Sequence, residues 1–223
     1  MCIVSFVVND NSFILTFNRD ETSVRPALPP AYHHENGLTI LSPTDQSKGG
    51  TWIGYNGRFA ACLQNGAFEK HHRHPPYRMS RGLILKEILN ETLSVETLNE
   101  NMLEGIEPFT MSIYNPKENT LKIYRYDAEH LHLQTIAPLQ QTIICSATLY
   151  NNEARTVIRS QFEALTGLSP DDLFEFNKTH RIGEPLNHFT NLVPTVSITQ
   201  LHITGEEVHS RYLDCITGEE WII

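Results

Sequence analysis

The sequence lacks a long apolar run, and it lacks an excess of basic residues. No apolar stretch approaches the roughly 18 residues that a membrane span requires, so none is predicted. Among 223 residues, 17 lysines and arginines stand against 26 aspartates and glutamates, for a net charge of −9. Such a charge disfavours binding to nucleic acid or to an anionic membrane surface. We therefore predict a soluble protein that has no nucleic-acid partner.

Cysteine is also scarce, and no export signal is evident. The N-terminal apolar stretch has no basic flank before it and no obvious cleavage site, so we interpret it as part of the mature fold. The cysteines are widely scattered, which favours reduced thiols and a cytoplasmic location over a disulfide framework. Away from the N-terminus they lie in apolar, strand-like surroundings typical of a core. The four are Cys2, Cys62, Cys145 and Cys215.

Internal repeats, heptad runs and low-complexity segments are missing, and no shift in composition marks a domain boundary. A length of 223 residues is within the range of one large domain. We therefore predict a single domain that spans residues 1–223. Nothing in the sequence specifies an oligomeric state.

The N-terminal stretch has the pattern of a β-hairpin. Two segments rich in Val, Ile and Phe flank the turn-forming residues Asn9–Ser12. If Val8 pairs with Phe13, Cys2 falls directly opposite Arg19, and paired residues have Cβ atoms about 5 Å apart. A shift of one residue in the turn would remove that pairing.

The rest of the chain alternates strand pairs with helical segments. The stretch 22–48 contains four prolines and is expected to be mostly loop, with a short strand near 38–41. Strand pairs joined by hairpins and interspersed with helices indicate an α+β protein with antiparallel sheets covered by helices. Further strands are expected within 49–63, 110–126, 130–135, 142–147 and 195–214, and helices over 80–90, 94–103 and 152–165 and from Ser169.

Two clusters invite a cofactor interpretation that their chemistry does not support. His71, His72 and His74 lie together, but neighbouring loop residues rarely point the same way, and no Cys or carboxylate pair completes a ligand set. The glycines before Trp52 lack the Gly-Lys-Ser/Thr ending of a phosphate loop, so a tight bend with a packed Trp52 is expected there. We predict no metal and no cofactor.

Five short motifs follow one another in the first third of the chain. Together, in this order and at these spacings, they resemble the NRDE family, also called the transport and Golgi organisation protein two family. The motifs are Met1-Cys2-Ile3, Asn18-Arg19-Asp20-Glu21, Gly49-Gly50-Thr51-Trp52-Ile53-Gly54, Asn65, and Ser80-Arg81-Gly82.

The later part of the chain departs from the family pattern at two places. Ser146 stands where the family tends to have an asparagine, and Val193-Pro194 stands where it has a Thr-Arg pair.

The family is similar to N-terminal nucleophile hydrolases, particularly the cysteine type that includes penicillin V and bile-salt amide hydrolases. This resemblance implies a four-layer αββα sandwich of antiparallel sheets. It also implies that Met1 is removed, which would make Cys2 both the nucleophile and the owner of a free α-amine. An α-amine has a pKa of about 8, which suits a base for the thiol.

The resemblance implies roles for further residues. Arg19 would hold the thiolate because a nearby cation lowers a cysteine pKa. Asp20 would orient the new amine, and Asn65 would donate to the oxyanion of an acyl-transfer intermediate. Binding roles are expected for Asn18, Trp52 and Ser146.

Each of these residues also has a structural interpretation. Cys2 is small enough to be a buried residue of the first strand. Arg19 and Asp20 suit an ion pair at a sheet edge, and Asn65 before Gly66 suits a turn. Two functions therefore remain open. The first is cysteine-dependent hydrolysis of a linear amide in a small-molecule substrate, and the presence of Ser146 in place of asparagine weakens it. The second is non-catalytic binding and trafficking of a hydrophobic ligand such as haem or acyl-lipid.

Overall fold

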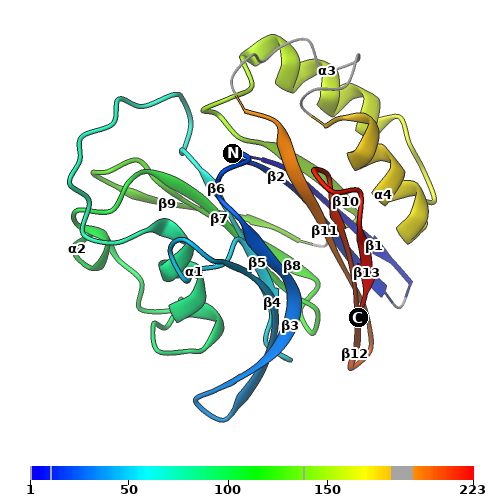
Figure 1. Cartoon of the computed structure of the whole chain (residues 1–223), viewed down its shortest axis with the longest axis horizontal. Helices are drawn as coiled ribbons and strands as arrows, with labels where there is room; N and C mark the ends of the chain where they lie inside the picture. Colours follow the sequence, from blue (N-terminus) through cyan, green and yellow to red (C-terminus); the bar gives the residue numbers. More distant parts are fainter. Residues whose placement is uncertain (1, 11, 138, 182–192) are drawn as a thin grey trace. The chain divides into compact units, whose positions relative to one another are not determined.

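Figure 1 shows a computed structural model of the chain, which describes residues 2–10, 12–137, 139–181 and 193–223. The chain divides into two compact units, each built on one antiparallel sheet with helices. The first comprises Met1–Val24 and Leu139–Ile223, and the second comprises Arg25–Pro138. Within the described ranges, no helix is long and apolar enough to cross a membrane. The single domain over 1–223 stays a prediction.

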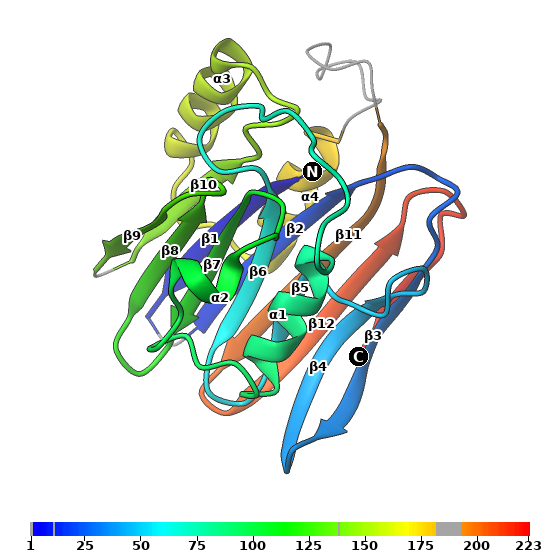
Figure 2. The same ribbon diagram turned by 90° about the vertical axis from the view of Figure 1, so that its left-hand side faces the viewer.

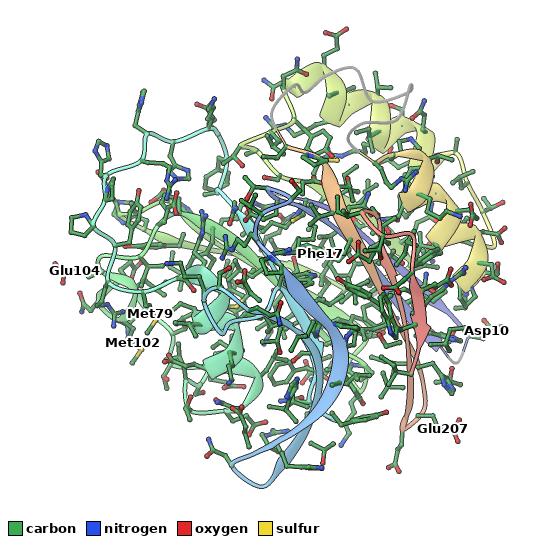
Figure 3. All side chains as sticks on the ribbon, viewed as in Figure 1. Asp10, Phe17, Met79, Met102, Glu104 and Glu207 are labelled. Atoms are coloured by element: carbon green, nitrogen blue, oxygen red, sulfur yellow. The ribbon has the colours of Figure 1, made fainter. Side chains whose placement is uncertain are left out.

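The sheet of the first unit has six strands in the order β10-β1-β2-β11-β12-β13. The N-terminal hairpin lies inside this sheet, and its predicted register is confirmed because Val8 pairs with Phe13 and Val4 with Phe17. Figure 3 shows Asp10 and Glu207 at the outer ends of two of its hairpins. The strands are β1 (Ile3–Asn9), β2 (Ser12–Asp20), β10 (Gln141–Cys145), β11 (Thr195–Thr204), β12 (Glu207–Asp214) and β13 (Glu220–Ile222).

Two helices, α3 (Asn152–Glu163) and α4 (Pro170–Thr179), cover one face of this sheet (Figure 1). Asn151 caps α3 through the backbone N–H of Ala154, and Ser169 forms a capping box with Asp172 at the start of α4. Apolar side chains of both helices pack on the sheet in one core. Its buried members include Ile3, Val7, Ile14, Ile143, Ile158, Phe162 and Leu173.

The sheet of the second unit has seven strands in the order β3-β4-β5-β6-β7-β8-β9, all antiparallel. Helix α1 packs against β5 and β6 in Figure 2, and Leu103 of the short α2 belongs to the same core as the buried residues of α1. The elements are β3 (Ala27–Glu35), β4 (Leu38–Asp45), β5 (Ile53–Tyr55), β6 (Ala60–Asn65), α1 (Arg81–Leu89), α2 (Glu100–Leu103), β7 (Phe109–Asn115), β8 (Thr120–Tyr126) and β9 (Leu131–Ile136).

Two expectations from the sequence are corrected, and one strand was not predicted. The proline-rich stretch contains β3, an edge strand, where a missing N–H does no harm, and Asn36-Gly37 turns it into β4 with both residues at positive φ. The helix expected over 94–103 shrinks to the four residues of α2, capped by the side chain of Asn99. The C-terminal strand β13 was not predicted because its three residues are too few for a periodic signal.

Two glycines, Gly50 and Gly82, allow the N-terminus of α1 to approach the neighbouring backbone closely. A Cβ on Gly50 would lie 2.5 Å from the carbonyl carbon of Gly82, so only glycine permits this approach. The backbone N–H of Thr51 donates to the carbonyl of Gly82 at 3.1 Å. The Gly-Gly-Thr motif and the Arg-Gly motif therefore meet at the N-terminus of α1.

Candidate active site

Cys2 immediately precedes β1, which lies between β10 and β2 in the sheet. Its carbonyl accepts a hydrogen bond of 2.9 Å from the backbone N–H of Ser146, just beyond the end of β10. Only 3% of the Cys2 surface is exposed. Strands β10 and β2 both end near the start of β1, so residues at these three strand ends surround the thiol.

Asp20 is the last residue of β2 and is 1% exposed. Thr195 donates its hydroxyl to Oδ1 of Asp20 at 2.6 Å, and Tyr150 donates its hydroxyl to Oδ2 at 3.3 Å. Burial raises the pKa of Asp20 to about 7, while both hydrogen bonds act in the opposite direction. The carboxyl is therefore poised to change charge near neutral pH.

The thiol of Cys2 is not a resting thiolate. Burial raises the pKa of Cys2 to about 11, and the negative charge of Asp20 adds to the rise. The expected effect of Arg19 on the thiol stays a prediction. Arg19 itself is 5% exposed and pairs with Ser197 of β11, and its charge acts to lower the pKa of Tyr212.

Ser146 joins the site through its backbone. Its hydroxyl lies 3.0 Å from the hydroxyl of Thr148, and its carbonyl accepts the backbone N–H of Tyr150 at 3.2 Å. The turn from Ser146 to Tyr150 is thus attached to Cys2 at one end and to Asp20 at the other. The structure brings together three predicted site residues, Cys2, Asp20 and Ser146.

Asn18 lies on the helix-covered side of the sheet, away from solvent. Its Nδ2 donates to the carbonyl of Asn177 at 2.9 Å, and its Oδ1 accepts from Nδ2 of Asn177 at 2.9 Å. Ser5 donates to Oδ1 of Asn177 at 2.6 Å. All three residues are fully buried. These contacts give Asn18 a structural role in holding α4, and its binding role stays a prediction.

Two predicted site residues, Asn65 and Trp52, belong to the second unit. Asn65 ends β6, pairs with Phe109 and precedes Gly66, whose φ of 83° makes the turn. Trp52 is 7% exposed, and its carbonyl accepts the backbone N–H of Leu63 at 2.9 Å. Trp52 is therefore buried, and the roles of both residues in a site stay predictions.

The loop that contains His71 and Arg73 is anchored by contacts with the carboxylate of Glu107. Glu107, 8% exposed, contacts Nε2 of His71 at 3.1 Å, Nε of Arg73 at 3.2 Å and a guanidinium nitrogen of Arg81 at 3.1 Å. Among the described residues, no group of three or more histidines, cysteines and carboxylates is arranged to hold a metal ion.

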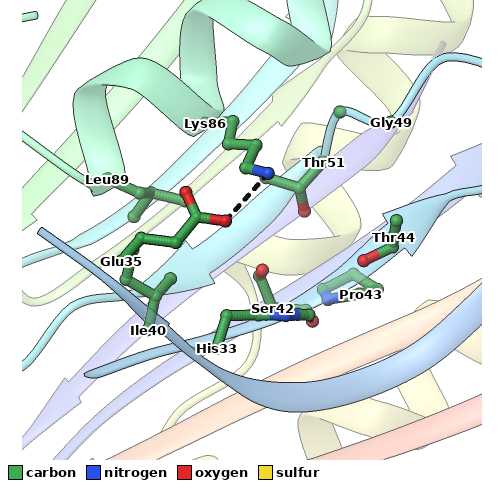
Figure 4. A pocket seen from close by; sticks show the side chains of 11 residues that line it. His33, Glu35, Ile40, Ser42, Pro43, Thr44, Gly49, Thr51, Lys86 and Leu89 are labelled. Atoms are coloured by element: carbon green, nitrogen blue, oxygen red, sulfur yellow. Dashed lines mark hydrogen bonds and ion pairs between the residues drawn. The ribbon is translucent and has the colours of Figure 1, made fainter. Parts of the chain in front are cut away.

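Figure 4 shows a small hollow within the second unit, where Lys86 of α1 reaches Glu35 at 2.9 Å. His33 and Ser42 also line it, with Nε2 of His33 3.1 Å from the carbonyl of Ser42. Its polar groups are thus largely paired with one another. The sequence motifs do not point to it, apart from the Gly-Gly-Thr segment on its rim.

The N-terminal motifs match a known sequence profile. The profile of Transport and Golgi organisation 2 covers residues 1–201. The chain belongs to this family. Its predicted membership is thereby confirmed, and the family motifs include Cys2, Asp20 and Asn65. No protein among those with curated functions matches the sequence.

Solved structures extend the comparison for this family member. A cysteine-to-alanine mutant of conjugated bile acid hydrolase from Clostridium perfringens aligns with a TM-score of 0.61 at 10% identity, covering 100% of this chain and 92% of that one. An arginine-to-leucine variant of the same hydrolase gives 0.57 at 11% identity, with the same coverage. This likeness confirms the predicted fold class, an α+β fold of antiparallel sheets similar to the N-terminal nucleophile hydrolases.

Tyr150 and Thr195 are site residues that the sequence analysis missed. Neither lies in the five motifs quoted from the sequence. They lie 130 and 175 residues from Asp20 along the chain, and only the folded sheet brings them to it.

Proposed function

We propose that the protein is a cysteine amidohydrolase of the N-terminal nucleophile type, acting on a linear amide in a small molecule after removal of Met1. The observation that carries the proposal is the adjacency of Cys2 and Asp20 at the ends of two central strands, both buried. The similarity of fold to a conjugated bile acid hydrolase adds support.

The chemistry begins with a proton transfer. A thiol with a pKa of about 11 is almost entirely neutral at pH 7, so Cys2 needs a base to attack a carbonyl. The α-amine of a processed Cys2 has an ordinary pKa of about 8 and lies on the same residue, which makes it the base. It takes the thiol proton while the sulfur bonds to the amide carbon.

The following steps release the two products. The C–N bond breaks as the leaving amine takes the proton from the α-ammonium group, which leaves a thioester on Cys2. A water molecule, deprotonated by the same amine, attacks the thioester, breaks the C–S bond and releases the carboxylic acid. The thiol is thereby restored.

The proposal gives the surrounding residues distinct roles. Asp20 orients the α-amine through its carboxylate, and Arg19 provides positive charge for the deprotonated sulfur. The family resemblance implies that Asn65 donates to the oxyanion, and this role stays a prediction. Ser146 replaces the second asparagine of the hydrolases, so we expect a modest rate that Ser146→Asn would raise.

Intact mass of the protein purified from cells is the first measurement. Loss of Met1 is expected, and a retained Met1 would refute the mechanism. The processed protein is then incubated with conjugated bile acids and N-acyl amino acids, and released amine is quantified by a fluorogenic reagent. Cys2→Ala should abolish release, whereas Cys62→Ser, a change at a buried cysteine of the other unit, should retain it.

The same preparation separates the alternative function. Saturable binding of haem or of an acyl-CoA without any amide cleavage, unaffected by Cys2→Ala, would favour binding and trafficking of a hydrophobic ligand. Cleavage that depends on Cys2 would favour the hydrolase.

A further inference from the structure

The carboxylate of Asp20 receives a hydroxyl on each of its two oxygens. Thr195 approaches Oδ1 at 2.6 Å, and Tyr150 approaches Oδ2 at 3.3 Å. All three side chains are buried, with exposures of 4% or less. A carboxylate that accepts two hydroxyl hydrogen bonds is fixed in direction, because rotation about its χ2 angle would lose both.

A break in strand pairing brings Thr195 to this position. Ser197 pairs with Arg19, but the next pair along the ladder is Thr195 with Asp20, so the bulged residue Val196 is skipped. A regular ladder would set Val196 opposite Asp20. Bulges commonly occur beside active sites, where they redirect a side chain. Here the bulge replaces an apolar neighbour of the carboxylate by a hydroxyl donor.

Tyr150 reaches Asp20 from a different element. It ends the turn that starts at Ser146, and the backbone N–H of Ser146 donates to the carbonyl of Cys2 at 2.9 Å. One turn therefore connects the nucleophile's backbone with the carboxylate. A displacement of this turn would move both ends of the site.

We propose that Thr195 and Tyr150 are positioning residues of the proposed hydrolase, which fix the direction of the Asp20 carboxylate and favour its ionised form beside Cys2. The inference rests on the proposed function because Asp20 matters only if it orients the α-amine. Hydroxyl donors favour the charged form of a buried carboxyl, and burial alone opposes it. The positive charge of the N-terminal amine also favours the ionised form of Asp20. The charge of Asp20 in turn acts on the thiols of Cys2, Cys145 and Cys215.

The test compares Thr195→Val, which keeps the shape and removes the donor, with Thr195→Ser, which keeps the donor. The protein is labelled with ¹³C-aspartate, and the Asp20 carboxyl signal, assigned by its loss in Asp20→Asn, is titrated by NMR. We expect Thr195→Val to raise the midpoint by about one to two pH units, since a hydrogen bond to a charged group is worth that much. Thr195→Ser should titrate like the unaltered protein. Tyr150→Phe should raise the midpoint less, because its bond is longer.

A second readout follows the thiol. In protein that has lost Met1, the rate of Cys2 alkylation by iodoacetamide is measured against pH by peptide mass spectrometry. The acidic limb of this profile should move to higher pH in Thr195→Val and stay in place in Thr195→Ser. A merely structural role would lower the rate at all pH values together.

The outcomes distinguish this inference from the proposed function. An unchanged Asp20 midpoint in both Thr195→Val and Tyr150→Phe would overturn the inference, whether or not amides are cleaved. A raised midpoint in protein that cleaves no amide would overturn the hydrolase proposal and support the control of Asp20 by its two donors. If Thr195→Val fails to fold, the midpoint in Tyr150→Phe decides.

Discussion

Replacement of Asn177 by alanine tests how the buried polar network under the first sheet contributes to stability. The side chain of Asn177 makes two hydrogen bonds, donating to Oδ1 of Asn18 at 2.9 Å and accepting from Ser5 at 2.6 Å. Both partners are fully buried, so Asn177→Ala leaves two polar groups without these bonds and without water. Each such group costs about 1–3 kcal/mol, which gives a loss of roughly 2–6 kcal/mol.

Urea denaturation followed by circular dichroism measures this loss. A domain is commonly stable by about 5–15 kcal/mol, so most of the expected range leaves a folded protein. The double variant Ser5→Ala with Asn177→Ala should recover about 1–3 kcal/mol, since one of the two stranded groups is gone. Glu175→Ala, an exposed change on the same helix, is the matched control. If Asn177→Ala is no more destabilising than this control, Asn18 is not held as described, and its amide is available for binding.

Three further predictions concern stability. Gly50→Ala should destabilise the second unit by more than Gly57→Ala. A Cβ at position 50 would lie 2.5 Å from the backbone of Gly82, whereas a Cβ at position 57 would meet no atom within 4 Å and only the positive φ opposes it. Thermal melts of the two variants measure the difference, and equal losses of stability would contradict this prediction. The folded pKa of Asp20, about 7, exceeds its ordinary 3.8, so its protonation stabilises the fold below about pH 4, and this contribution is lost as the pH rises through 7. Asp20→Asn should therefore gain stability relative to the unaltered protein between pH 5 and 8, and a constant difference would refute the raised pKa. Ser169→Ala removes the capping box of α4 and should cost about 1 kcal/mol in urea denaturation, whereas Ser169→Thr, which keeps the hydroxyl, should cost less.

Local sequence patterns predicted the parts of the fold whose contacts are local. The register of β1 with β2 follows from a turn flanked by apolar segments, and the start of α4 follows from its cap at Ser169. The prolines of β3 led to a wrong prediction of a loop, because a proline disrupts a sheet only where a partner strand needs its N–H. An edge strand has one side without that requirement, and edge position is a property of the whole sheet.

The sequence by itself predicted that Cys2 and the Asn18-Arg19-Asp20-Glu21 motif would meet at the end of one hairpin, because the register of two strands joined by a short turn depends on local residues, and the structure confirms the register. Only the tertiary structure decided what surrounds them. Thr195 comes opposite Asp20 through a bulge in a strand 175 residues away, and Asn177 reaches Asn18 from a helix on the sheet face. Burial then sets the charge of both groups, since the pKa of Cys2 and of Asp20 depends on how completely distant segments exclude water from them.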